Sequence, residues 1–307
     1  MSFTAINLDK AGTPQVIPQP SPENILAARK ARLIELAELR GDAEYAANLK
    51  ATLELASEPL VIQLEEDSYR EHIVRQDVQD AGLGNMLAFA RGTTLDHLGA
   101  FYGVARQIVQ QADNTVSPPI PEIMESDDRL RKRIQLAPEG FTTAGSRGSY
   151  IYWGLAASPE VKDIVAEETA TPGEVSVTVL STEGDGTPSA ELIARVISEI
   201  TPRKALSAEL IVSAATIHTY EIHATIWVYD GPDAEVVRQA AEAEGREFVR
   251  EHHKLGHDIT IAGLHAAIYR EGVQNINLGD FDADLIVGSQ GAAYCAALTV
   301  TVGGRNV

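Results

Sequence analysis

The stretch that decides the fold reads ESDDRLRKRI over residues 125–134, then PEG over 138–140, then TTAGSRGSYIYW over 142–153. Its first half predicts a helix, because Ser126 can cap the free amides and Asp127 favours the positive end of the helix dipole. The Pro-Glu-Gly segment predicts the end of that helix. The chain before this stretch has a helical pattern, and the chain after it mixes strands with helices.

The second half of the stretch predicts another short helix, with Thr142 or Thr143 as the capping residue. The apolar side chains of this helix, Ile151 and Trp153 among them, need a surface to pack against. The whole stretch is therefore interpreted as the joint at which a helical region gives way to an α+β region.

The length and composition bound the class of protein. A chain of 307 residues that is 44% hydrophobic can bury a substantial core, and two or three domains are expected. It contains no run of 18 uncharged apolar residues and no signal-peptide pattern at its start, so neither a membrane span nor a leader is predicted. The single cysteine, Cys295, excludes an internal disulfide and fits assembly in a reducing cytoplasm.

The acidic charge is spread along the whole chain. The net charge is −19, with 10 basic against 16 acidic residues in 1–115, 9 against 15 in 116–215, and 6 against 13 in 216–307. A uniformly acidic surface repels phosphate and anionic lipid, so binding to nucleic acid or to a membrane is not expected. The basic cluster at Arg129 to Arg133 is diluted by the acidic residues directly before it.

The N-terminal part is predicted to be elongated and helical. Residues 1–21 are interpreted as an extended proline-rich arm, either disordered or laid on a partner. Residues 22–115 are expected to form an all-α region, with Leu33 and Leu36 on an apolar face. Helices are predicted over 22–39 with Ser21 as the cap, 43–57, 59–80, 85–90 and 94–102. Such helices either bury their apolar stripes against other chains or form an ordinary bundle, and the sequence leaves both open.

The rest of the chain is predicted to be α+β. A proline-rich linker at 110–121 precedes a central domain over 120–215 and a C-terminal domain over 216–303. Each is expected to pair helices with one face of a small mixed, mostly antiparallel sheet. The strands are predicted at 161–165, 175–180, 208–212, 218–229, 273–278 and 296–302, and the helices at 189–200, 233–253 and 261–269.

Three histidines resemble a metal cluster. His253 and His257 have the spacing of zinc-binding helices, and His252 adjoins them. Gly256 lies between the two spaced residues, where the helix is expected to end, so the rings are not expected to share a face. The favoured interpretation is cationic histidine near a helix C-terminus.

The other candidate sites lack an essential part. Asp280, Asp282 and Asp284 imitate a calcium loop, but the loop lacks the required glycine and the bidentate glutamate. Ser146 lacks the spacing of a nucleophile elbow, and Cys295 is expected to be a buried small hydrophobic residue. No catalytic, cofactor-binding or metal-binding residue is therefore predicted, and the chain is not expected to be an enzyme.

Several blocks in order resemble one family. They look like the successive segments of the baseplate J family of contractile phage tails and tail-like bacteriocins, especially its short members from temperate phages. The resemblance covers most of the chain from about residue 60. The blocks are 94–106, 125–134, 143–153 and 161–165, followed more weakly by 183–187, 229–232, 253–257 and 271–273.

The resemblance implies a structural role without cofactors. Members pair with a second copy of themselves and with an I-type wedge protein, and six such wedges surround a central hub and spike. Neighbouring wedges and sheath-proximal proteins are further expected partners. The implied location is the phage tail baseplate, or a tail-like particle, assembled in the cytoplasm of the host bacterium.

The interface candidates follow from this implied role. They are the basic residues of the joint and two leucines of the helical region, namely Arg129, Arg131, Arg133, Leu33 and Leu36. Two alternatives stay open from the residues alone: a tail-associated enzyme such as a wall hydrolase, and a generic helical adaptor.

Overall fold

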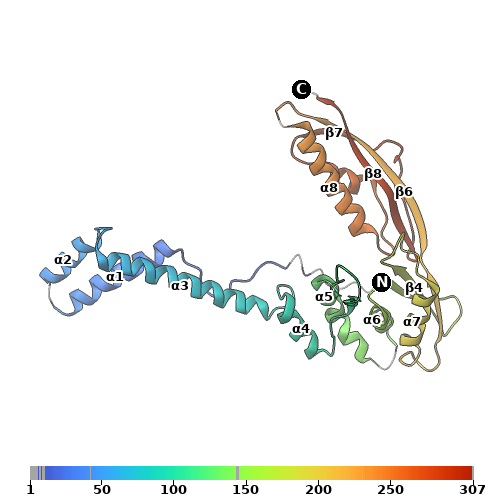
Figure 1. Cartoon of the computed structure of the whole chain (residues 1–307), viewed down its shortest axis with the longest axis horizontal. Coiled ribbons are helices and arrows are strands. Elements are labelled where there is room, and N and C mark those ends of the chain that lie inside the picture. The colour runs from blue at the N-terminus through green and yellow to red at the C-terminus, as the bar shows by residue number, and fades with distance from the viewer. Residues whose placement is uncertain are drawn as a thin grey trace. The chain divides into compact units, whose positions relative to one another are not determined.

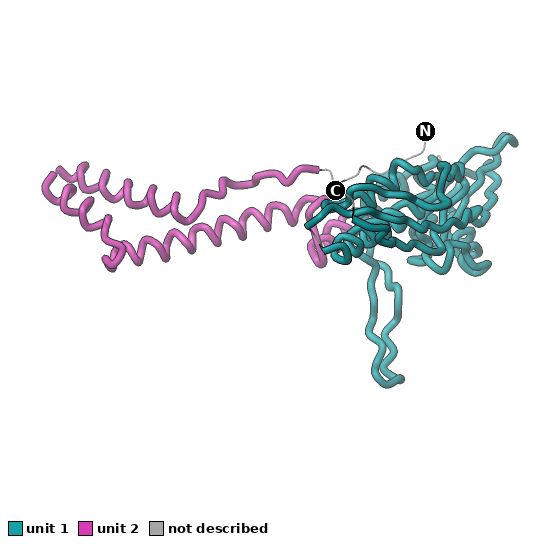
Figure 2. Tube along the Cα trace, turned by 90° about the horizontal axis from the view of Figure 1, so that it is seen from above, with its two compact units in different colours: residues 1–5, 102–307 teal, residues 6–101 magenta. Residues whose placement is uncertain are grey.

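The computed structural model describes residues 6, 8, 11–41, 43–142, 145–231 and 233–305. They form two compact units, shown in different colours in Figure 2. Residues 6–101 are called the helical unit here, and the described residues from 102 onward are called the α+β unit. No helix among the described residues is long and apolar enough to cross a membrane.

The first three predicted helices are present in the helical unit (Figure 1). Ser21 caps the first, accepting a hydrogen bond of 3.3 Å from the amide of Asn24, and Pro22 opens it. The third helix runs four residues beyond its predicted end, and residues 85–90 form turns in place of the predicted short helix. The helices are α1 (Pro22–Leu39), α2 (Ala43–Leu53), α3 (Pro59–Gly84) and α4 (Gly92–Phe101).

The core of the helical unit is small. Leu53, Val61 and Leu64 are buried, and partly buried side chains of α1 and α2 pack against them. An ion pair of 2.8 Å between Arg29 and Glu71 joins α1 to α3. The apolar stripes of α1 and α3 therefore meet within one chain, although much of α3 stays outside this core.

The described part of the proline-rich arm lies along α3 of the same chain. Gln79 donates to the carbonyl of Pro14 at 2.8 Å and accepts from the amide of Val16 at 2.8 Å. His72 contacts the carbonyl of Pro20 at 3.0 Å. Polar side chains of α3 thus satisfy backbone groups of the arm between Pro14 and Pro20. Packing of the arm on a partner stays a prediction.

The α+β unit begins with a two-stranded hairpin. Strands β1 (Ile108–Gln110) and β2 (Ile123–Met124) pair antiparallel, and an isolated bridge joins Asp113 to Ile120 nearer the tip. The segment predicted as a linker thus has a defined structure, and Figure 2 shows a hairpin extending away from the rest of this unit.

The first sheet follows the deciding stretch. Its order is β3-β4-β5, with strands β3 (Val161–Glu168), β4 (Glu174–Ser181) and β5 (Glu209–Ala214). Helix α7 (Ala190–Ile200) joins β4 to β5 and is capped by Ser189, as predicted. Helix α5 (Asp127–Leu136) is capped by Ser126, also as predicted, and a 3-10 turn over Ala137–Phe141 ends it.

Helix α6 (Arg147–Ala157) is the buried centre of this part. It begins at Ser146, whose hydroxyl accepts from the amide of Ser149 at 3.2 Å. The predicted start at Thr142 is wrong, because Thr142 closes the preceding 3-10 turn, and Thr143 lies outside the described residues. Ile151 is 7% exposed and Trp153 is half-buried against the guanidinium of Arg203, so both have found packing partners.

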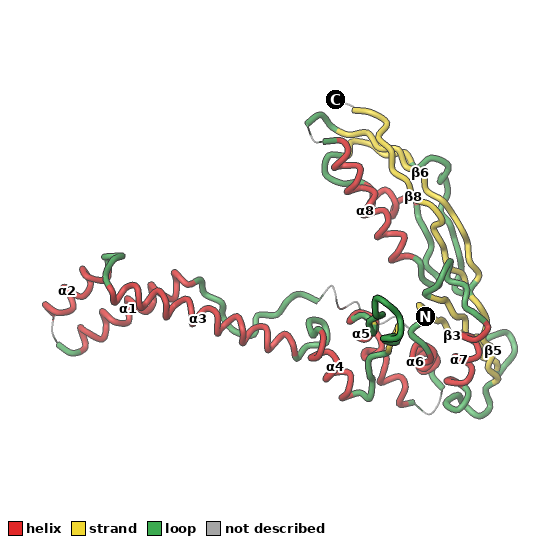
Figure 3. The backbone as a smooth tube through the Cα atoms, viewed as in Figure 1, coloured by secondary structure: helices red, strands yellow, loops and turns green. Residues whose placement is uncertain are grey.

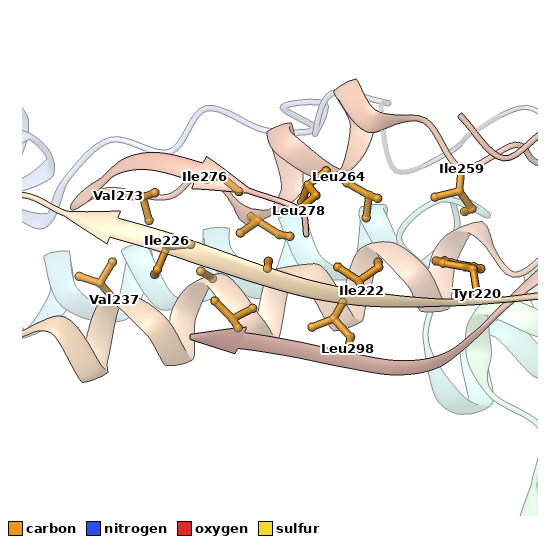
Figure 4. Packing of buried hydrophobic residues seen from close by; sticks show 14 of the residues in the cluster. Tyr220, Ile222, Ile226, Val237, Ile259, Leu264, Val273, Ile276, Leu278 and Leu298 are labelled. Atoms are coloured by element: carbon orange, nitrogen blue, oxygen red, sulfur yellow. The ribbon is translucent and has the colours of Figure 1, made fainter. Parts of the chain in front are cut away.

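The second sheet has the order β7-β6-β8. Its strands are β6 (Thr216–Val228), β7 (Val273–Asn277) and β8 (Gly291–Arg305), and helices α8 (Ala234–His252) and α9 (Ile261–Ile268) lie between β6 and β7 in the chain. Side chains on one face of β6, including Ile222 and Ile226, pack against both helices (Figure 4). The alternate apolar side chains predicted along this strand therefore face one core, as is typical of a half-buried strand.

Both sheets are mixed, and the α+β class is confirmed. β3 and β4 are antiparallel while β4 and β5 are parallel; β6 and β7 are antiparallel while β6 and β8 are parallel. The strands are yellow in Figure 3. The expected mixed sheets are thus present, and with β1–β2 three of the five strand pairs among the described residues are antiparallel. β4 and β5 are parallel because helix α7 between them carries the chain back to the same end of the sheet.

β8 is an edge strand, and two arginines of α8 bind its backbone. Arg238 and Arg246 of α8 donate to the backbone carbonyls of Val300 and Leu298 at 3.2 and 3.3 Å. Glu242 lies between the two arginines on α8 and binds both. The side chains of α8 thus occupy hydrogen-bonding groups of β8.

Candidate functional site: interaction surfaces

An apolar face of α3 is left uncovered within the chain. Ile62 and Tyr69 are each 54% exposed and Ile73 is 36% exposed. Their spacing of seven and four residues places them on one side of the helix. This set of three residues is called the α3 face here.

Acidic residues border the α3 face. Glu65, Glu66, Asp77 and Asp80 follow its members at helical spacings that keep them on the same side. Arg70 is the basic residue nearby, and it binds Glu66 at 2.6 Å. An apolar stripe with an acidic border is complementary to an apolar helix with basic flanks.

The two predicted leucines of α1 are more buried than the α3 face. Leu33 packs against the core of the helical unit, and Leu36 is half-buried. The large apolar residue most exposed on α1 is Leu39, at 72%. Leu33 is therefore engaged inside the chain, and its role at an interface stays a prediction.

The predicted arginine cluster surrounds a buried carboxylate. The Glu125 side chain has no exposed surface, and Arg129 and Arg133 both form ion pairs with it. Arg129 Nε lies 3.2 Å from Glu125 Oε2, and Arg133 also donates to the carbonyl of Ala105 at 3.1 Å. We call these three residues the Glu125 network.

Arg129 is also bonded to the backbone beyond this carboxylate. Its guanidinium donates to the carbonyls of Leu155 at 3.2 Å, Ser158 at 2.8 Å and Val161, so α5 is fastened to α6 and β3. Burial lowers the pKa of Arg129, and the Glu125 carboxylate opposes that shift. Arg129 and Arg133 thus serve the fold, and their predicted contact with another subunit stays a prediction.

Arg131 lies on a different side of α5 from the Glu125 network. It binds Asp128 at 2.7 Å, and the Asp128 side chain is 91% exposed while that of Arg131 is 12% exposed. Its predicted place at an interface also stays a prediction.

The sequence contained a signal for the Glu125 network. Glu125, Arg129 and Arg133 are four residues apart, so a helical extension places all three on one side. Asp128 and Arg131 lie between them in the sequence, so the segment has the appearance of one charged patch. The four-residue spacing, and not the local density of charge, separates the Glu125 network from Asp128 and Arg131.

The base of the hairpin is held by the same carboxylate. Glu125 Oε1 accepts from the amide of Gln107 at 2.9 Å, and the Gln107 side chain donates to the carbonyl of Ala156 at 2.8 Å. Arg106 donates to the carbonyl of Glu125 at 2.7 Å and binds Asp127 at 2.7 Å. Both strands of the hairpin therefore leave the unit from fixed positions.

The three histidines do not form a cluster. His253 lies against Lys162, His252 stacks on Phe248 with ring centroids 3.9 Å apart, and His257 lies edge-on to His252 at 6.0 Å. Across the described ranges, no three side chains of His, Cys, Asp or Glu come together as metal ligands.

The remaining candidates have structural partners. Asp284 accepts from the amide of Ile261 at 2.7 Å and so supports the start of α9. Ser146 caps α6 and lies 3.0 Å from Glu139, and burial raises the pKa of the Cys295 thiol. Ser146 and Asp284 thus have structural roles at the starts of α6 and α9.

His253 supplies a test of pH dependence. Lys162 Nζ lies 2.8 Å from His253 Nδ1, and an ammonium at this place donates to an unprotonated ring nitrogen. This contact disfavours the cationic form that the sequence predicts. Burial first, and the Lys162 charge second, lower the pKa of His253. The unfolded chain then binds the proton more readily, so this residue reduces the free energy of unfolding as pH falls below the ordinary value of about 6.5.

We therefore expect His253→Gln to flatten the fall in free energy of unfolding between about pH 7 and pH 5. Urea denaturation at a series of pH values measures it, and His252→Gln on the same turn is the matched control. An unchanged pH profile in His253→Gln would contradict the burial of a neutral ring.

Comparison with known proteins identifies the family. Residues 56–113 match the Baseplate J-like N-terminal domain, and residues 142–214 match the Baseplate J-like central domain. Baseplate protein J of Escherichia phage P2 is 39% identical over 303 residues, which cover 98% of this chain and 99% of that protein. The chain belongs to the baseplate J-like family.

A solved structure is also similar in part. One chain of the structure entitled "Cryo-EM structure of the anti-feeding prophage (AFP) baseplate, 6-fold symmetrised" shares 13% identity at a TM-score of 0.39. The match covers 63% of this chain and 49% of that chain, so it spans about half of that chain's length.

The family relationship confirms the predicted resemblance. The two matched ranges include the predicted blocks at 94–106, 143–153, 161–165 and 183–187. As a baseplate J-like protein, the chain is a structural protein of the phage tail baseplate. The prediction that it is not an enzyme agrees with this structural role.

Proposed function

We propose that this baseplate J-like protein is a wedge subunit of a contractile phage tail or tail-like particle. It assembles with a second copy of itself and an I-type wedge protein around the hub and spike, and it contacts neighbouring wedges and sheath-proximal proteins. The subunit forms in the host cytoplasm, and its contacts rearrange when the sheath contracts. The observation that carries the proposal is the α3 face, a row of exposed apolar side chains on a helix that the chain itself does not cover.

The composition of the α3 face supports assembly through helices. A 26-residue helix that buries only Val61, Leu64 and Ser68 has most of its surface available. Covering Ile62, Tyr69 and Ile73 removes apolar area from water, at about 25 cal/mol for each Å². A partner helix with basic flanks would satisfy the acidic border as well.

We expect replacement of Ile62, Tyr69 and Ile73 together by Glu to prevent co-purification with the I-type wedge protein. Three carboxylates placed in an apolar contact would be desolvated, and the affinity should fall by two orders of magnitude or more, since each lost anchor costs about 1–2 kcal/mol. Pull-down from co-expressing cells, followed by titration calorimetry, measures the effect.

The matched control for this experiment is Ile286→Glu. Ile286 is 65% exposed and lies between β7 and β8 in the chain, outside the helical unit. Retention of the complex by the triple variant, with unchanged affinity, would refute the α3 face as the contact.

A further inference from the structure

The hairpin over residues 107–125 is exposed beyond its base. From Ile108 to Met124 no residue is buried, and Gln110 and Asp113 alone in that range are half-buried. Six large apolar side chains in this range are between 37% and 55% exposed: Ile108, Val109, Val116, Ile120, Ile123 and Met124. An isolated two-stranded hairpin is marginally stable in water, so exposed apolar residues along it indicate a surface that covers them elsewhere.

The base of this hairpin is held by hydrogen bonds, while no residue between Ile108 and Met124 is buried. The bonds of Gln107 and Arg106 to Glu125 tie both strands to the buried network described above. A hairpin held this way presents its side chains in a defined direction, which lowers the ordering cost of binding.

The backbone of the return strand is poorly suited to pairing with another sheet. Pro118, Pro119 and Pro121 have no amide hydrogen, and the amide of Ile120 already donates to Asp113 at 2.8 Å. A strand added along this side would meet few donors. Recognition through the return strand therefore relies on side chains.

The charge of the hairpin limits what can receive it. Residues 108–124 contain Asp113 and Glu122 and no Lys, Arg or His. Thr115 bonds to the Asp113 carboxylate and lowers its pKa, so this residue is ionised at neutral pH. A receiving groove with a basic rim complements these two carboxylates.

A second copy of this chain offers the wrong charge. The chain carries 44 acidic and 25 basic residues, with an acidic excess in every third of its length. Most arginine side chains with a described ion pair are bound to carboxylates of their own unit, as in the Glu125 network and along α8. Like-charge repulsion therefore disfavours self-association through the hairpin.

We infer that the hairpin over residues 107–125 is a docking arm that inserts into an apolar groove with a basic rim on a different protein of the same assembly. This inference rests on the proposed function for the assembly, and it names a second contact, separate from the α3 face. Residues 114–141 lie between the two ranges that match the family domains. Residues 114–125 of the arm fall in this interval, and residues 107–113 lie within the range that matches the N-terminal domain.

A cross-linking experiment in assembled tails tests this arm. p-Benzoylphenylalanine is placed at Val116, which is 42% exposed, and, as a control, at Ile286. After irradiation of purified tails, mass spectrometry identifies the cross-linked peptides. We expect Val116 to cross-link to a peptide of another protein that contains apolar residues beside Lys or Arg.

Cross-linking of Val116 to a second copy of this chain, or no cross-link in tails that contain the protein, would overturn the inference. Absence of the protein from purified tails would instead overturn the proposed function. The two failures are therefore distinguishable.

Two variants give a quantitative measure in the full-length chain. Ile120→Ser with Ile123→Ser should lower incorporation into tails about tenfold or more, while Ile286→Ser should not. Glu122→Lys should lower incorporation and Glu271→Lys, on a different loop, should not. Equal incorporation of the Ile120/Ile123 variant and its control would also count against the arm.

Discussion

Replacing Glu125 with Ala is expected to lower the free energy of unfolding of the α+β unit by about 3–5 kcal/mol. The Glu125 side chain is fully buried, and removing it leaves the charges of Arg129 and Arg133 without their carboxylate partner. Two buried or nearly buried guanidinium groups would then have to be hydrated or moved. Because the same carboxylate holds the amide of Gln107, the base of the hairpin should loosen as well.

Urea denaturation followed by tryptophan fluorescence measures this effect. Trp153 lies on α6, the helix that Arg129 binds through the Leu155 carbonyl, so it reports on the correct region. Asp128→Asn is the control from the same segment, since this carboxylate is 91% exposed and its ion pair with Arg131 should contribute less than about 1 kcal/mol. Equal stability of the two variants would show that the Glu125 network does not stabilise the α+β unit.

Replacing Ile226 with Ala is expected to cost about 2–5 kcal/mol through the second core. Ile226 has no exposed surface and lies on the covered face of β6, in the cluster that also contains Val237 of α8 and Ile276 of β7. Its truncation removes apolar contacts and leaves a cavity that the surrounding side chains fill only partly.

Thr225→Ala, one residue earlier on the opposite face of β6, is the matched control. Thr225 is half-buried and lies 3.3 Å from Thr301 by its hydroxyl, so its loss should change the free energy of unfolding by about 0.5 kcal/mol or less. If the two variants unfold at the same urea concentration, the assignment of the two faces of β6 is wrong.

Local signals in the sequence predicted much of the fold. Ser21, Ser126 and Ser189 each cap the helix that their positions indicate, because the hydroxyl–amide bond is made within four residues. The alternation over 218–229 likewise predicted β6, since burying one face fixes the period. The start of α6 was missed because three hydroxyl residues, Thr142, Thr143 and Ser146, compete as caps within five positions.

The pairing of strands and the role of the arginines needed the structure. The alternation in β4 and β6 tells which face is buried but not which strand lies beside it or in which direction. The sequence therefore predicts mixed sheets without saying which pairs are parallel. The prolines of the hairpin break its periodicity and so predict a linker, while the pairing of Asp113 with Ile120 depends on residues seven apart. Likewise, the contact of Glu125 with the amide of Gln107 joins residues 18 apart, which the local charge pattern does not reveal.

The arginines of α8 that bind β8 have a consequence for the free protein before assembly. A long edge strand with an apolar run such as ALTVTV over 297–302 can template the addition of identical strands and so lead to insoluble aggregates. Arg238 and Arg246, held in place by Glu242, occupy two of the carbonyls that an incoming strand would use. These two bonds therefore protect the exposed edge of the second sheet against aggregation by strand addition.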